Sequence, residues 1–175
     1  KLGRQTMAKW LITFYGQLTA LEKYFTKQMY KMKFLNMDET PLKVLDFRTE
    51  GGKISNTSYM FIRQGSSFDD KTKTIRKLVS CSYIQSRSKE SLIDDYSLND
   101  CTSYVMTDGL KAYNKFDKHC CCWVHAVRDF KKILKDRPEQ NAKTIVLLVA
   151  DLYEIEDKYR AQLLNGEIDS QTFLS

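Results

Sequence analysis

The sequence predicts an α/β domain, because its 175 residues show the hydrophobic patterns of both helices and strands. Two long stretches, at residues 5–30 and 145–163, repeat apolar residues every three or four positions, as amphipathic helices do. Between them, short apolar runs bounded by turn residues predict strands, first as hairpins and then alternating with helices. With 42% hydrophobic and 12% aromatic residues, the chain can bury a core of its own.

The first long helix is expected over residues 5–30. Its apolar stripe consists of Met7, Trp10, Leu11, Phe14, Leu18, Leu21 and Phe25. Residues 1–33 hold seven Lys or Arg and one acid, Glu22, so that they account for the whole formal net charge of +6. Such a segment is typical of a protein that binds a polyanion, and equally of a lysine-rich helix face exposed to water.

The next elements are expected to be strands. Residues 34–37 form the first, which runs into Asp38-Glu39-Thr40-Pro41, where Pro41 should stop further pairing and leave Asp38 at the end of the strand. Three further strands are expected in antiparallel order at residues 43–47, 58–63 and 78–84, with Gly51-Gly52 between the first two.

The second half of the chain alternates helices and strands. The expected order is a helix at 88–96, a strand at 103–106, a helical segment at 110–116, a strand at 120–124, a helix at 126–135 that stops near Pro138, and the second long helix, which Asn165-Gly166 caps. In this order Asp108 follows a strand.

Two aspartates are the candidate catalytic residues. Asp38 and Asp108 each follow a short apolar strand, so they can meet at the carboxyl edge of one sheet. Carboxylates are preferred ligands of Mg²⁺, and a pair of such ions can hold both reacting oxygens of a phosphoryl transfer. Spacing alone leaves the alternative that each aspartate forms a turn or caps a helix.

The cysteines favour a reducing environment. The chain has five of them, an odd number, and Cys120, Cys121 and Cys122 are consecutive, which makes a poor disulfide framework. The Cys-x-x-His spacing of Cys122 and His125, close to His119, suggests zinc, but the chain has no second paired motif. A strand at 120–124 would place buried cysteines on both of its faces, with Cys120, Cys122 and Val124 on one and Cys121 and Trp123 on the other.

Other classes of function lack support in the sequence. A nucleophilic cysteine with His119 or His125 as base has no identifiable third group, and no phosphate-binding or dinucleotide-binding glycine motif is present. No apolar run approaches the ~20 residues of a membrane span, and no signal peptide is visible, so a soluble, cytoplasmic protein is expected. Because residue 1 is Lys, the chain is expected to be a piece of a longer protein.

Several segments, in order, resemble motifs of the insertion sequence 66 transposases. Residues 38–45, 107–114 and 122–130 are similar to the family's A-D-E-T-P-x-x-V-L, T-D-G-Y-x-A-Y-N and C-W-A-H-x-R-R-x-F motifs. Residues 3–10 resemble its S-R-Q-T-L-A-N-W segment, and Ser86-Arg87-Ser88 resembles its P-S-R-S turn. The likeness extends from about residue 3 to residue 160.

This resemblance implies a ribonuclease H-like fold, that is, a mixed five-stranded sheet flanked by helices and preceded by a long helix. It also implies a D-D-E triad in which Asp38 and Asp108 are the two aspartates and hold Mg²⁺ or Mn²⁺. The family's glutamate lies in a later D-N-N-x-x-E-R segment, and nothing in residues 130–175 resembles it. Glu154 and Glu156 fall on the second long helix, where they are interpreted as solvated positions rather than replacements.

The resemblance divides the chain into a basic helix at 1–32, a partial ribonuclease H-like core at 33–136, and a long helix and tail at 137–175 that begin a family insertion. It implies DNA as partner, as element ends and target, no membrane, a possible homo-oligomer, and a cytoplasmic protein that joins the bacterial nucleoid when bound to DNA. Val127 replaces the first arginine of the third motif. The candidate DNA contacts are Arg4, Lys9, Arg87, His125 and Arg128.

The expected function is therefore that of a DNA transposase catalytic domain, incomplete in this chain. Two alternatives stay open. One is a truncated or degenerate transposase that binds DNA or a partner subunit without cutting, and the other is a metal-dependent nuclease of the same fold that cleaves without joining strands.

Overall fold

Five strands form one mixed sheet in a computed structural model that describes residues 3–44, 57–94, 98 and 101–174. The strands are β1 (Phe34–Lys43), β2 (Thr57–Asp69), β3 (Thr74–Ile84), β4 (Tyr104–Thr107) and β5 (His119–Cys121). The helices are α1 (Arg4–Met29), α2 (Trp123–Asp136), α3 (Gln140–Asn165) and α4 (Ser170–Leu174), with short helical turns η1 (Glu90–Asp94) and η3 (Lys111–Tyr113).

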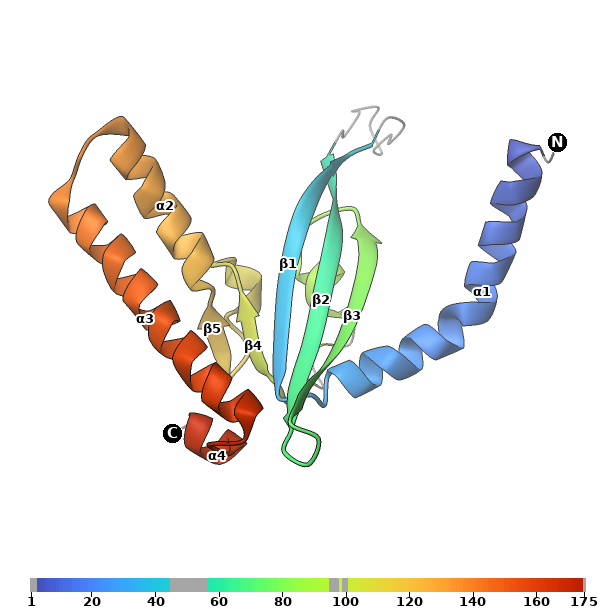
Figure 1. The fold of residues 1–175 in the computed structure, drawn as a ribbon. Helices are drawn as coiled ribbons and strands as arrows, with labels where there is room; N and C mark the ends of the chain where they lie inside the picture. Colours follow the sequence, from blue (N-terminus) through green and yellow to red (C-terminus); the bar gives the residue numbers. More distant parts are fainter. Residues whose placement is uncertain (1–2, 45–56, 95–97, 99–100, 175) are drawn as a thin grey trace.

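The sheet has the order β3-β2-β1-β4-β5 (Figure 1). β1, β2 and β3 are antiparallel neighbours, whereas β4 is parallel to β1 and β5 is parallel to β4. This order arises because hairpin connections build the first half, while the second half returns through helical segments to add parallel strands. The expected α/β architecture, a mixed five-stranded sheet of ribonuclease H-like type with a long N-terminal helix, is confirmed.

The two long helices are also confirmed. α1 starts at Arg4 and ends next to Tyr30, within one residue of the expected bounds. α3 ends at Asn165 and is capped by Gly166, whose φ of 78° is the left-handed conformation that favours glycine after a helix. Figure 1 shows α1 projecting away from one end of the sheet, while α2 and α3 form a helical hairpin on the other side. No helix in the described ranges is long and apolar enough to cross a membrane.

β1 corrects one prediction. The strand does not stop before Pro41, which pairs with Tyr59 of β2, so Asp38 lies inside β1 rather than at its end. β2 pairs with all of β1, but β4 pairs only with Phe34 to Asn36, so the other edge of β1 carries no paired strand at Pro41 in the described part of the chain. A residue without an N–H group is tolerated at such an edge. Of the expected strand at 43–47, residues 45–47 lie outside the described residues, as do Gly51 and Gly52.

β5 corrects a second prediction. It ends at Cys121, and Trp123 already begins α2, so Cys122 and Val124 do not share a strand face with Cys120. The expected burial of the cysteines is also wrong, because Cys120 and Cys121 are exposed and Cys122 is half-buried. The reason is that β5 is a three-residue strand at the edge of the sheet, where little covers its side chains.

Alternate residues of β1 determine which face of the sheet holds the core. Leu35, Met37 and Glu39 are buried, whereas Asn36, Asp38 and Thr40 are exposed. The buried face packs against the short helical segments, and its core consists of Met29, Tyr30, Leu35, Met37, Phe61, Ile84, Leu92, Ile93, Leu98, Val105 and Tyr113. Of the expected helices at 88–96 and 110–116, the described residues form only the turns η1 and η3.

Candidate active site

The pairing of β1 with β4 brings the two candidate aspartates to the same level of the sheet. The last pair of this parallel ladder is Asn36 with Met106. Asp38 and Asp108 each lie two residues beyond that pair, Asp38 within β1 and Asp108 directly after the end of β4. Residues 70 positions apart in the chain therefore become neighbours at the carboxyl end of β4.

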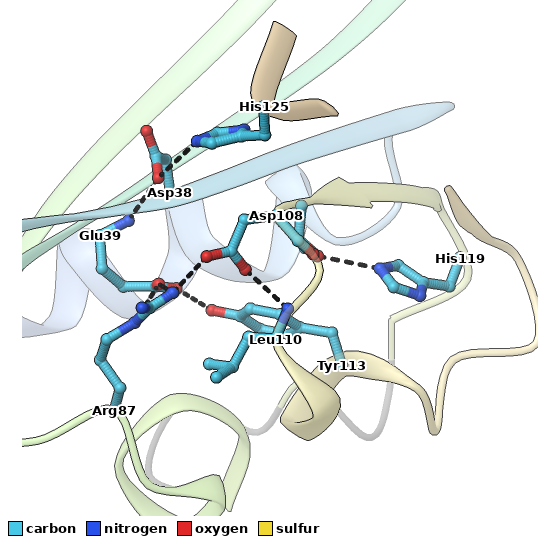
Figure 2. A network of polar contacts seen from close by, with 9 residues as sticks. Asp38, Glu39, Arg87, Asp108, Leu110, Tyr113, His119 and His125 are labelled. Atoms are coloured by element: carbon cyan, nitrogen blue, oxygen red, sulfur yellow. Dashed lines mark hydrogen bonds and ion pairs between the residues drawn. The ribbon is translucent and has the colours of Figure 1, made fainter. Parts of the chain in front are cut away.

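Asp38 is the more accessible of the two. Its side chain is 55% exposed, and His125 Nε2 lies 3.8 Å from its Oδ1 atom. The same Oδ1 accepts a hydrogen bond of 2.9 Å from the backbone N–H of Glu39. His125 belongs to the first turn of α2, and its Nδ1 atom is buried without a hydrogen-bond partner among the described residues. Figure 2 shows Asp38 and His125 together on one side of β1.

Asp108 is held by two donors. Its Oδ1 atom accepts a hydrogen bond of 3.0 Å from the backbone N–H of Leu110, and its Oδ2 atom is paired with the guanidinium group of Arg87. Its side chain is 22% exposed. The backbones of the two aspartates therefore lie at one level of the sheet, but their carboxylates lie on opposite sides of β1 (Figure 2). Asp38 lies with His125 on the exposed side, and Asp108 lies with Arg87 on the side of the buried Glu39.

Glu39 anchors the arginine from the buried face. Its side chain is only 1% exposed, and it accepts hydrogen bonds from Arg87 Nε at 2.9 Å and from the hydroxyl of Tyr113. Burial raises the pKa of Glu39 above its ordinary value, although Tyr113 and Arg87 act in the opposite direction by stabilising the charged form. Arg87 thus joins the buried Glu39 to the more exposed Asp108.

Glu39 and Tyr113 were not predicted from the sequence as part of the site. Both occur in the segments that resemble family motifs, and Glu39 directly follows Asp38. These motifs are therefore the sequence feature from which the two residues could have been predicted. A third unpredicted contact joins Thr107 Oγ1 to His119 Nε2 at 2.9 Å and ties β4 to β5 just before Asp108.

Comparison with known protein families identifies the family to which this chain is similar. A model described as the transposase IS66 family matches residues 1–172, nearly the whole chain. The chain belongs to the transposase IS66 family. No curated protein and no solved structure matched it significantly. The match includes α1 and α3 as well as the sheet, so the IS66-family assignment does not depend on the site motifs alone.

In this IS66-family chain, the candidate DNA contacts fall into two groups. Arg87 and His125 lie at the aspartates, and Arg128 is exposed one turn after His125 on α2. Arg4 and Lys9 are exposed on α1, which projects away from the sheet on the other side from α2 (Figure 1). The structure therefore does not bring all five residues to one surface.

The donor set at the aspartates suits a hard cation. Mg²⁺ is usually held by one or two carboxylates together with water and substrate phosphates. Asp38 offers an exposed carboxylate, whereas the carboxylate of Asp108 is paired with Arg87 on the other side of β1 and would have to leave that partner to share an ion with Asp38. Across the described ranges, no group of three or more His, Cys, Asp or Glu side chains is placed to hold a metal ion. A cation here would therefore rely on water, phosphate or a further acid for its remaining ligands.

Proposed function

We propose that the chain is the catalytic-domain portion of a DNA transposase that uses Mg²⁺ or Mn²⁺ to cleave and join DNA strands. The observation that supports this proposal most directly is the parallel register of β1 with β4, which brings the backbones of Asp38, within β1, and Asp108, just after β4, to one level of the sheet. Membership in the transposase IS66 family supports it independently of that geometry.

In this proposal Asp38 and Asp108 hold the metal. A bound divalent ion activates water or a 3′-hydroxyl group and stabilises the leaving oxygen of a phosphoryl transfer. The alternation of side chains along β1 places the Asp38 carboxylate on the exposed side of the strand, where His125 Nε2 lies 3.8 Å from it. Arg128, exposed on the same helix as His125, can contact a DNA phosphate by paired hydrogen bonds.

Metal binding by the chain itself tests the assignment. We expect Asp38→Asn or Asp108→Asn to weaken Mn²⁺ binding, followed by electron paramagnetic resonance, by about tenfold or more. Asp129→Asn is the matched control, because Asp129 is an exposed acid on α2 whose partner is Lys132. Unchanged Mn²⁺ affinity in both site variants would refute the assignment.

A second candidate is a transposase remnant that binds DNA or a partner subunit without cutting it. It is favoured by the absence, within the part of the chain that the structure describes, of a three-ligand acidic cluster. Cleavage assays on the transposase that contains this chain distinguish the two. Metal-dependent cleavage that both Asp→Asn changes abolish supports catalysis, whereas DNA binding with no cleavage at any metal concentration supports the remnant.

Strand transfer separates a transposase from a nuclease of the same fold. A pre-cut DNA end with a free 3′-hydroxyl bypasses the cleavage step, so a transposase joins it to target DNA in the presence of Mg²⁺. Cleavage of intact ends without any joining of pre-cut ends would identify a nuclease.

A further inference from the structure

The most prominent unexplained surface is the apolar face of α1. Of its 26 residues, all of which are described, Met29 alone is buried. Six apolar side chains along the helix are between 38% and 69% exposed. They are Met7, Leu11, Phe14, Leu18, Leu21 and Phe25. A face of this length is too apolar to be left in water without a partner.

The spacing of these six residues identifies the kind of partner. They follow one another at alternating intervals of four and three, and Gln28 continues the pattern for one more step. This is the heptad spacing by which one helix packs along another in a coiled coil. We call these six residues the α1 seam.

The charges of α1 are placed away from this seam. In the same heptad frame Lys9 and Lys23 occupy the outermost position, opposite the seam, and Lys27 lies two residues beyond Phe25 on the outer surface. The positions that flank the seam carry mainly uncharged side chains, among them Trp10, Tyr15 and Tyr24. Two copies of this basic helix can therefore meet at the seam without bringing their lysines together.

We propose that α1 pairs with α1 of a second copy of this chain in an antiparallel coiled coil. In that orientation the seam is self-complementary about its centre: Met7 meets Phe25, Leu11 meets Leu21, and Phe14 meets Leu18 of the second copy. Arg4 then faces Gln28 of the second copy, whereas in a parallel pair Arg4 would face Arg4 of the second copy and the two positive charges would repel each other. The two sheets then lie at opposite ends of the helix pair, because each 26-residue helix is about 39 Å long when measured along its axis, which is bent in Figure 1.

The available area is sufficient for a stable pair. Aromatic side chains bury about 150–250 Å² each when fully covered. The half-exposed seam residues and three flanking aromatics therefore bring together roughly 1,400 Å² over two copies, within the roughly 1,200–2,000 Å² of specific interfaces. This inference concerns assembly and does not depend on the proposed catalytic role.

Sedimentation velocity of the full chain tests the proposal with a closely matched control. Leu11 and Ile12 are neighbours with nearly equal exposure, 69% and 72%, but only Leu11 belongs to the seam. In reducing buffer, which keeps the free cysteines from cross-linking, we expect the unaltered chain to dimerise between about 1 and 100 µM. Leu11→Glu should weaken dimerisation by about 30-fold or more, and Ile12→Glu should leave it nearly unchanged.

A charge-pair variant tests the orientation. In the antiparallel pair, the glutamate of Leu11→Glu faces the lysine of Leu21→Lys in the second copy, so the double variant should dimerise more tightly than either single variant. In a parallel pair the two glutamates at position 11 would face each other, as would the two lysines at position 21, and the double variant would stay monomeric. A monomeric unaltered chain, or equal effects of Leu11→Glu and Ile12→Glu, would overturn the proposal.

Discussion

Two adjacent residues of β1 have different roles, because successive side chains of a strand point to opposite faces of the sheet. Asp38 points to the exposed face, where His125 is its neighbour, and Glu39 points into the core, where it binds Arg87 and Tyr113. The buried glutamate thus fixes the position of an arginine that also holds Asp108. One dipeptide supplies both an accessible carboxylate and the anchor of the network around it.

Tyr113→Phe tests how much this anchor contributes. The variant removes one hydrogen bond to a buried carboxylate and leaves the rest of the fully buried ring in place. Hydrogen bonds to charged groups contribute about 1.5–3 kcal/mol, so we expect the free energy of unfolding at pH 7 to fall by about that amount. Urea denaturation followed by circular dichroism measures the change.

The same variant has a predictable pH dependence. Burial raises the pKa of Glu39 above its ordinary value of 4.5, and the hydrogen bond from Tyr113 opposes that rise, so its loss raises the pKa further. The folded variant therefore binds protons more readily than the folded parent. Its stability deficit should grow as the pH rises through the titration of Glu39, above pH 4.5, and shrink at lower pH.

Tyr83→Phe provides the control for this prediction. Tyr83 also makes a side-chain hydrogen bond, 2.9 Å to Ser58, but it is half exposed, and its hydroxyl makes no hydrogen bond to a carboxylate among the described residues. Its replacement should cost less than about 1 kcal/mol. A loss of unfolding free energy in Tyr113→Phe that does not depend on pH, or an equal loss in Tyr83→Phe, would show that the hydrogen bond to Glu39 does not stabilise the fold more than an ordinary side-chain hydrogen bond does.

At the scale of elements, the two long helices were predictable from the sequence, whereas the short helical turns and the strand ends were not. The apolar repeat of α1 and the glycine at the end of α3 are local signals, and both gave the correct bounds within a few residues. The end of β1 depends on which neighbour pairs with Pro41, and the exposure of Cys120 and Cys121 depends on β5 lying at the sheet edge. Sheet order decides both, and no short stretch of sequence contains it.

The junction between α1 and the sheet gives a prediction at this scale. A Cβ atom on Gly65 of β2 would lie 2.6 Å from Met29 Cγ and 3.1 Å from the Met29 carbonyl oxygen. Because the backbone as well as the side chain is in the way, we expect Gly65→Ala to lower the free energy of unfolding by about 1–3 kcal/mol. Gly109→Ala, where nothing lies within 4 Å, should change it by less than about 0.5 kcal/mol.

Thermal and urea unfolding measure the stability of the two alanine variants relative to the parent chain. Equal stability of Gly65→Ala and the parent would mean that α1 can shift on β2 without loss, so that the junction does not fix the direction of the helix. Loss of stability in Gly109→Ala would instead point to a constraint at the turn after β4.

At the scale of the whole molecule, the sequence led to the expectation that Asp38 and Asp108 lie at one level of the sheet, but not to the partners that hold their carboxylates on different sides of β1. Their approach follows from the parallel pairing of β1 with β4, which the order of strands and helices already suggested. The partners could not be predicted, because Arg87 is 48 residues from Glu39 and Tyr113 is 74 residues from it. Contacts of that range depend on the finished sheet and on the turns packed beneath it.

The distribution of charge over the molecule leads to the last prediction. Residues 1–33 carry the whole formal excess of +6, and in the structure Lys9 and Lys23 lie exposed on the outer side of α1. If this face contacts DNA phosphates, each lost contact should reduce the slope of log affinity against log salt concentration by about 0.9. We therefore expect the double variant Lys9→Gln, Lys23→Gln to bind duplex DNA more weakly, with a slope smaller by about 2.

The double variant Lys143→Gln, Lys158→Gln removes the same charge from exposed positions of α3 and serves as the control. Fluorescence anisotropy at several salt concentrations gives both slopes. A smaller slope for the α1 variant alone places the phosphate contacts on α1. Equal changes in both variants would mean that DNA responds only to the total charge of the chain, because a long-range field does not distinguish lysines on α1 from those on α3.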